Sequence, residues 1–155
     1  MFFTVCSSPL GTLFLISDGT SLTGLWPGPR NPVPKEEQRD DLSVFHSAKA
    51  WLSDYFSGRP RDVDFPLSPA GTEFQHRVWN LLLEIPYGET VTYGNLADQL
   101  GANMAPQAVG QAVGRNPIAI IIPCHRVVGA RDRLTGYAWG TEKKKWLLRH
   151  EEENK

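Results

Sequence analysis

The side chains best suited to covalent chemistry lie together near the middle of the second half of the chain, where Pro123, Cys124, His125, Arg126 and Val127 follow one another. A thiolate, not a thiol, is the nucleophile of cysteine chemistry, and a neighbouring imidazole or guanidinium can favour the ionised form. The five residues before Pro123 are apolar and uncharged, which predicts a buried strand ending at the cysteine. This favours a nucleophilic cysteine, although a Cys-His pair alone is also typical of a small buried thiol beside an unrelated histidine.

The remaining cysteine usage argues against other chemistry. The chain has one other cysteine, Cys6. Two cysteines with no C-x-x-C or His/Cys cluster make neither a disulfide framework nor a structural zinc site. We therefore predict no metal and no other cofactor. The first residues lack a basic leader, and the longest apolar stretch is too short to span a bilayer. These features predict a cytoplasmic protein with no membrane partner.

Charge is distributed unevenly along the 155 residues, although the net charge is only -1. Residues 1–68 carry 6 Lys/Arg against 8 Asp/Glu, whereas residues 106–150 carry 8 against 2, a net of +6. A basic surface of this kind is typical of nucleic-acid binding, but many proteins have a solvated basic face with no such partner. Charge alone leaves both interpretations open.

The elements that must position these side chains begin with a β-rich segment. Three short β-like runs, residues 2–6, 12–17 and 21–26, are separated by turn residues and predict an antiparallel sheet. Residues 27–41, rich in proline and charge, predict a loop without regular structure. A helix that covers the sheet is then predicted from apolar residues at helical spacing: Val44, Ala48, Trp51, Leu52, Tyr55 and Phe56. Residues 1–68 thus read as a small α/β domain.

Residues 69–155 read as a mostly α-helical second domain. The capping-box pattern that starts at Thr72 and ends at Gln75 predicts a helix that reaches about Glu84. Residues 93–100 and 106–113 then predict two short helices, the first stopped by a glycine and the second started by a proline. This spacing is typical of a helix-turn-helix, although two packed helices of any small domain can look the same.

Several motifs in order extend this interpretation: Tyr93, the predicted helix-turn-helix, Gly114-Arg115-Asn116-Pro117, residues 122–129 around Cys124, Leu134-Thr135-Gly136-Tyr137, and Trp146-Leu147-Leu148-x-x-Glu151. With them the chain resembles the O6-alkylguanine-DNA alkyltransferases, closely over residues 69–151 and more weakly over residues 1–68. The resemblance implies an RNase H-like α/β domain with an antiparallel sheet and a covering helix. It also implies a winged helix-turn-helix DNA-binding domain that carries the active site.

The resemblance further implies repair of DNA by direct reversal. Cys124 would accept an alkyl group, chiefly methyl, from O6-alkylguanine in double-stranded DNA and keep it, so that each molecule acts once; O4-alkylthymine stays open as a second substrate. His125 would take the thiol proton through a water, and Glu151 would orient His125. Tyr93 would donate to N3 of the leaving guanine. Asn116 would hold the turn between the recognition helix and the active site rather than react.

Other positions follow from the same resemblance. The carbonyls of Cys124 and Val127 would bind the exocyclic amine of guanine, and the N–H of Ala138, beside Tyr137, would donate to O6. Trp139 replaces the glycine of several relatives, so we expect bulky O6 adducts to be excluded. The base would be flipped through the minor groove. The DNA contacts would come from Ala108 and Gly110 on the recognition helix, from Gln107 where most relatives have arginine, and from the phosphate-binding groups Arg115, Arg126, Arg131 and Lys143 to Lys145.

Three alternatives remain beside this prediction. An alkyltransferase-like protein recognises the lesion without accepting the group, but it has another residue where Cys124 stands. A helix-turn-helix regulator predicts sequence-specific binding and a dimer, whereas we expect a monomer, with cooperativity on DNA left open. A cysteine hydrolase needs an oxyanion hole, which the sequence does not reveal.

Overall fold

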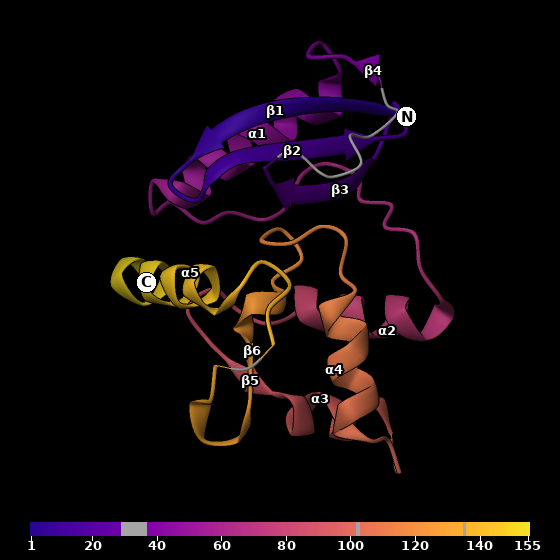
Figure 1. Cartoon of the computed structure of the whole chain (residues 1–155), viewed down its shortest axis with the longest axis vertical. Helices are drawn as coiled ribbons and strands as arrows, with labels where there is room; N and C mark the ends of the chain where they lie inside the picture. The colour runs from indigo at the N-terminus through magenta and orange to yellow at the C-terminus, as the bar shows by residue number, and fades with distance from the viewer. Residues whose placement is uncertain (29–36, 102, 135) are drawn as a thin grey trace. The chain divides into compact units, whose positions relative to one another are not determined.

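The computed structural model describes residues 1–28, 37–101, 103–134 and 136–155, which fall into two compact units, Met1–Ala70 and Gly71–Lys155 (Figure 1). The units are described separately below. Within these described ranges, no helix combines the length and apolar character needed to cross a membrane.

The first unit is built on a mixed four-stranded sheet. Strands β1 (Phe2–Ser8), β2 (Gly11–Ser17), β3 (Leu22–Pro27) and β4 (Glu37–Gln38) lie in the order β3-β2-β1-β4. The first three form the predicted antiparallel meander, whereas β4 pairs in parallel with β1. The prediction of an irregular loop is therefore wrong at residues 37–38, because two backbone bonds attach this segment to the free edge of β1: Glu37 N to Met1 O and Arg39 N to Phe3 O. Residues 29–36 of that predicted loop lie outside the described part.

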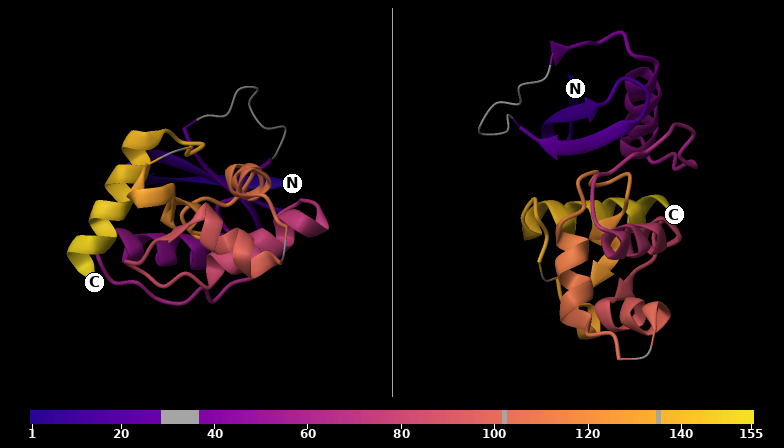
Figure 2. Two further views of the ribbon diagram at one scale, coloured as in Figure 1. Left: turned by 90° about the horizontal axis from the view of Figure 1, so that it is seen from below. Right: turned by 90° about the vertical axis from the view of Figure 1, so that its right-hand side faces the viewer.

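One face of this sheet is covered by α1 (Ser43–Phe56), as both views of Figure 2 show. The helix carries the predicted apolar stripe, and the side chains buried beneath it include Phe45 and Leu52 from the helix and Leu13, Leu15 and Leu25 from the sheet. Burial of such side chains is the main favourable contribution to folding. The predicted covering helix is confirmed.

The described residues of the second unit form four α-helices: α2 (Glu73–Leu83), α3 (Tyr93–Leu100), α4 (Pro106–Gly114) and α5 (Thr141–Asn154). Helix α2 begins with the predicted capping box, in which Thr72 Oγ1 accepts from Gln75 N at 3.1 Å and Gln75 Oε1 accepts from Thr72 N at 2.9 Å. The indole of Trp79 is buried in the core and donates to Ala112 O at 2.9 Å, which fixes α2 against α4.

Helices α3 and α4 form the predicted helix-turn-helix pair. Gly101 ends α3 with a φ of 134°, a conformation that glycine adopts without strain, and Pro106 occupies the first turn of α4. After α4 the chain forms the short 3-10 helix η1 (Cys124–Arg126), strand β6 (Val127–Val128), which pairs in parallel with β5 (Val91–Thr92), and the 3-10 turn η2 (Ala130–Asp132). Residues 118–122 are buried as predicted, but they form a turn, with Ile120 at a φ of 71°. The prediction of a strand there is wrong.

Candidate active site

Asn116 holds the turn that leads to the cysteine. Its Nδ2 donates to Ile122 O at 2.8 Å, and its Oδ1 accepts from Ile118 N at 3.0 Å. The side chain thus supplies the partners that a strand ladder would have given these two buried backbone groups, which explains why an apolar run folds as a turn. A further bond, from Ile122 N to Ile118 O at 3.0 Å, closes the same turn. The role predicted for Asn116 is compatible with this placement.

Cys124 begins η1 and is buried. Burial raises the pKa of its thiol to about 11, and the side chains of Asn116 and Lys144, which favour the thiolate, offset only part of that effect. Neighbouring groups thus favour the ionised form, as expected, but burial outweighs them. The thiol is protonated at neutral pH and must lose its proton during the reaction.

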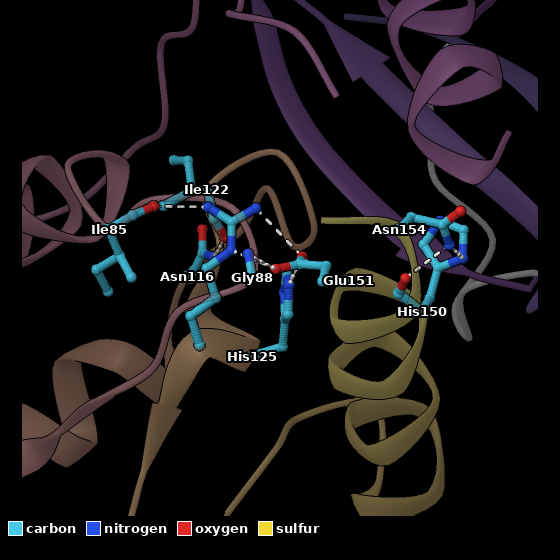
Figure 3. Close-up of polar contacts among 9 residues, drawn as sticks. Ile85, Gly88, Asn116, Ile122, His125, His150, Glu151 and Asn154 are labelled. Atoms are coloured by element: carbon cyan, nitrogen blue, oxygen red, sulfur yellow. Dashed lines mark hydrogen bonds and ion pairs between the residues drawn. The ribbon is translucent and has the colours of Figure 1, made fainter. Parts of the chain in front are cut away.

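Behind the cysteine, three buried side chains form one hydrogen-bonded cluster (Figure 3). His125 Nε2 lies 2.5 Å from Glu151 Oε2. Arg126 Nε donates to Glu151 Oε1 at 2.8 Å, and Arg126 Nη2 donates to Glu151 Oε2 at 3.2 Å. The backbone N–H of Gly88 adds a fourth bond, to Glu151 Oε1 at 3.0 Å. Each carboxylate oxygen of Glu151 thus accepts two hydrogen bonds, and these bonds hold α5 against η1.

Ionisation within the cluster follows from these contacts. Although burial opposes a charge on Glu151, its bonds to His125 and Arg126 hold the pKa of the carboxyl well below its usual range. Burial lowers the pKa of His125, as do Arg126 and Lys144, while the bond and charge of Glu151 act in the opposite direction. His125 is therefore neutral at neutral pH and donates from Nε2, the nitrogen that faces Glu151. Its Nδ1 is buried and contacts no hydrogen-bonding group of the described residues, which leaves a lone pair able to accept a proton.

Lys144 is the second buried cation near Cys124. Its Nζ donates to Val127 O at 2.6 Å, so that α5 holds the strand that follows η1. Burial lowers the pKa of Lys144, and the cysteine opposes this effect. The Val127 carbonyl, one of the two predicted to bind the guanine amine, therefore already accepts a hydrogen bond from Lys144. Its second lone pair leaves room for one more donor.

A small pocket lies against Cys124. It is lined by Val113, Gly114, Asn116, Ala119, Cys124, Gly136, Tyr137, Ala138 and Trp139. Five of the residues predicted from sequence, Cys124, Asn116, Tyr137, Ala138 and Trp139, are thus brought together here. The enclosed space is only about 10 Å³, at most the room that one water molecule needs. This space is smaller than a purine base.

Tyr93 lies beside this pocket. A Cβ added to Gly110 of α4 would stand 3.7 Å from two carbons of the Tyr93 ring, and one added to Gly136 would stand 4.0 Å from its hydroxyl oxygen. The glycine in α4 thus lets the tyrosine pack close to the helix, with its hydroxyl near the segment that closes the pocket. The Tyr93 hydroxyl thus lies near Gly136, a residue of the pocket wall.

Comparison with known proteins identifies the family. The domain described as 6-O-methylguanine DNA methyltransferase, DNA binding domain, matches residues 73–153, and its ribonuclease-like domain matches residues 1–69. The chain belongs to the 6-O-methylguanine DNA methyltransferase family. The two-domain fold predicted from that resemblance is confirmed as well.

Individual members of the family are similar over almost the whole chain. A methylated-DNA--protein-cysteine methyltransferase of Methanosarcina acetivorans is 44% identical over 153 residues, which is 97% of this chain and 98% of the relative. The crystal structure of Mycobacterium tuberculosis OGT in complex with DNA is 44% identical, has a TM-score of 0.90, and is matched over 99% of this chain and 94% of that one. An O6-methylguanine DNA methyltransferase of Methanococcus jannaschii is 29% identical, with a TM-score of 0.74 over 98% and 95% of the two chains.

The predicted DNA-contacting residues of this family member divide into two groups. Gln107, Ala108 and Arg115 are exposed on or just after α4, and Gly110 is half-buried beneath Tyr93. Arg126 is 8% exposed and bound to Glu151 and to Ile85 O, so its prediction as a phosphate contact is wrong. Lys144 is likewise interior, unlike its neighbours Lys143 and Lys145. Two of the basic residues credited to a surface thus serve the interior.

Sequence reasoning missed the parts of the site that come from distant backbone. Gly88 N and Ile85 O bind Glu151 and Arg126, and Tyr87 packs its ring 5.6 Å from the Arg126 guanidinium. The one available signal was the segment Ile85-Pro86-Tyr87-Gly88 itself, an apolar, aromatic and glycine-containing turn. Backbone partners leave no signature in residue type.

Proposed function

We propose that this protein repairs alkylated double-stranded DNA by moving an alkyl group, chiefly methyl, from O6 of guanine to Sγ of Cys124. The carbon–sulfur bond forms as the carbon–O6 bond breaks, and the thioether product is not reversed, so each molecule acts once. One observation carries the proposal: the buried thiol of Cys124 lies on a pocket wall, and the next residue, His125, is paired with Glu151.

The proton balance of the reaction supports the roles of these residues. With a thiol pKa of about 11, only about one molecule in 10⁴ holds a thiolate at neutral pH. The proton must therefore leave as the sulfur attacks, and the free lone pair of His125 Nδ1 is the acceptor, reached through one bridging water. His125 gains a positive charge in this step, which the ionised Glu151 stabilises from the other side of the ring.

The leaving guanine must be stabilised at the same time. Negative charge develops on the base as the alkyl group leaves, and a proton from the Tyr93 hydroxyl to N3 together with a hydrogen bond from Ala138 N–H to O6 would neutralise it. Both groups border the pocket or its closing segment. The backbone carbonyls of Cys124 and Val127 would bind the exocyclic amine, with Lys144 holding the second of these in place.

DNA is the partner on which the site acts. A buried thiol cannot reach a base stacked in a duplex, so the nucleotide must be rotated out at a cost of a few kcal/mol. Helix α4 presents Gln107 and Ala108 on its exposed side, and the exposed Arg115 follows its last residue. Small residues on this side suit close approach to the minor groove. We further propose that the protein acts as a cytoplasmic monomer.

A stoichiometric transfer assay tests the proposal. A duplex with one tritiated O6-methylguanine is mixed with a series of protein concentrations, and the label left in the DNA is counted after the reaction is complete. We expect one methyl group lost per protein molecule, no further turnover, and no loss with Cys124→Ser. Continued turnover, or removal by Cys124→Ser, would contradict the proposal; the matched control Cys6→Ser keeps full stoichiometry.

A further inference from the structure

Arg126 contacts the general base only through Glu151, yet it makes more polar contacts in the cluster than His125 does. It gives two hydrogen bonds to Glu151 and a third, at 2.7 Å, to Ile85 O. Its guanidinium also lies over the ring of Tyr87. All this occurs with 8% of the residue exposed, so the positive charge is fixed in the interior next to the histidine that must receive a proton.

The charges around His125 decide its resting state. The titratable groups that surround it are Cys124 and Arg126 on η1 and Lys144 and Glu151 on α5, with Tyr87 on Arg126 and Tyr137 beside Cys124 and Glu151. Arg126 and Glu151 balance one another when His125 is neutral. Protonation of His125 would place an uncompensated positive charge in a buried cluster that already faces Lys144, which is costly.

Without Arg126 the balance would be reversed. A buried carboxylate beside a histidine is neutralised when the histidine carries a proton, so a lone His125–Glu151 pair would rest as an ion pair. A protonated His125 has no lone pair on Nδ1 and cannot accept the proton of Cys124. The guanidinium therefore keeps the carboxylate ionised while weakening, but not abolishing, its pull on the imidazole.

We propose that Arg126 is a positioning residue that satisfies the charge of Glu151 and so keeps His125 neutral and ready to accept the thiol proton; this rests on the proposed transfer to Cys124. This role can be distinguished from simple packing because the effect of losing Arg126 on the transfer rate depends on pH. A packing defect lowers the rate of transfer equally at every pH, whereas loss of the charge balance lowers it most where His125 becomes protonated.

The proposal is tested by single-turnover transfer rates measured between about pH 5.5 and 9. Three proteins are compared: Arg126→Gln, Arg126→Lys and the parent. Glutamine keeps a donor but removes the charge. We expect a rate at least about tenfold below that of the parent at pH 6.5, which requires about nine in ten His125 rings of the variant to be protonated at that pH. The deficit narrows as the pH rises. Arg126→Lys, which keeps the charge, recovers most of the acid-side rate. A uniform deficit at all pH values, or a lysine variant no better than glutamine, overturns the proposal.

The protonation state of His125 in the unaltered protein gives a second test, which does not depend on a change in the transfer rate. Nitrogen-15 NMR of histidine-labelled protein, with His125 assigned by its loss in His125→Ala, reports the state of both ring nitrogens. We expect a neutral ring with the proton on Nε2 at pH 7. A doubly protonated ring overturns the role of Arg126 even if transfer occurs, whereas a parent protein that transfers nothing while its His125 is neutral contradicts the proposed function alone.

Discussion

Replacing Asn116 with alanine tests whether one side chain holds the turn that presents Cys124. The amide donates to Ile122 O at 2.8 Å and accepts from Ile118 N at 3.0 Å, and these two residues are 1% and 0% exposed. Alanine would leave one buried donor and one buried acceptor without partners, at about 1–3 kcal/mol each. We therefore expect the free energy of unfolding of the second unit to fall by about 2–6 kcal/mol.

The effect is measured by urea denaturation, together with hydrogen exchange at the amide of Ile118. The matched control is Asn80→Ala, which makes the same change at an exposed position of α2 and should alter stability by less than about 0.5 kcal/mol. Because the turn also sets the position of Cys124, the transfer rate of Asn116→Ala should fall under conditions in which the variant is still folded. Stability equal to that of the control, or a normal rate in a destabilised protein, would refute the reasoning.

Three further predictions concern the pocket and the DNA-binding helix. Gln107→Arg should speed single-turnover transfer from methylated duplex by about threefold to tenfold, because a hydrogen bond from a charged group is worth ~1 kcal/mol more than a neutral one. Equal rates for the variant and the parent, or the same gain from the control Gln111→Arg, would contradict this prediction. Because Trp139 lines the pocket, O6-benzylguanine should label Cys124 far more slowly than methylated DNA reacts with it. Trp139→Gly should narrow this difference in rate by about tenfold or more, since a bulky side chain no longer fills a closed cavity. Equal rates of the two reactions in the unaltered protein would contradict this prediction. Because the thiol pKa of Cys124 is about 11, its modification by iodoacetamide in the absence of DNA should rise about tenfold per pH unit from pH 7 to 10, and a plateau by pH 8 would show that the thiol is already ionised.

The local signals in the sequence that predicted structure correctly are those with a short-range physical cause. The capping box at Thr72 satisfies the first N–H groups of α2 whatever the rest of the chain does. The glycine that ends α3 and the proline that starts α4 act in the same way. Such features depend on a few neighbouring residues, so they can be recognised without a structure.

The features that the sequence did not reveal depend on partners far along the chain. An apolar run such as residues 118–122 fits a strand or a buried turn equally well, and only the bonds of Asn116 decide for the turn. Arg126 reads as a surface cation until Glu151, 25 residues away, is placed beside it. Burial likewise decides the ionisation of Cys124, since desolvation outweighs the neighbouring groups that favour the thiolate.

The most direct test of the central claim is mass spectrometry of the intact protein and its peptides after reaction with a stoichiometric O6-methylguanine duplex. The account predicts a gain of one methyl group, located on the peptide that contains Cys124 and absent from the peptide that contains Cys6, with saturation at one per molecule. A protein that binds the duplex and gains no mass, or that carries the methyl group elsewhere, would contradict it.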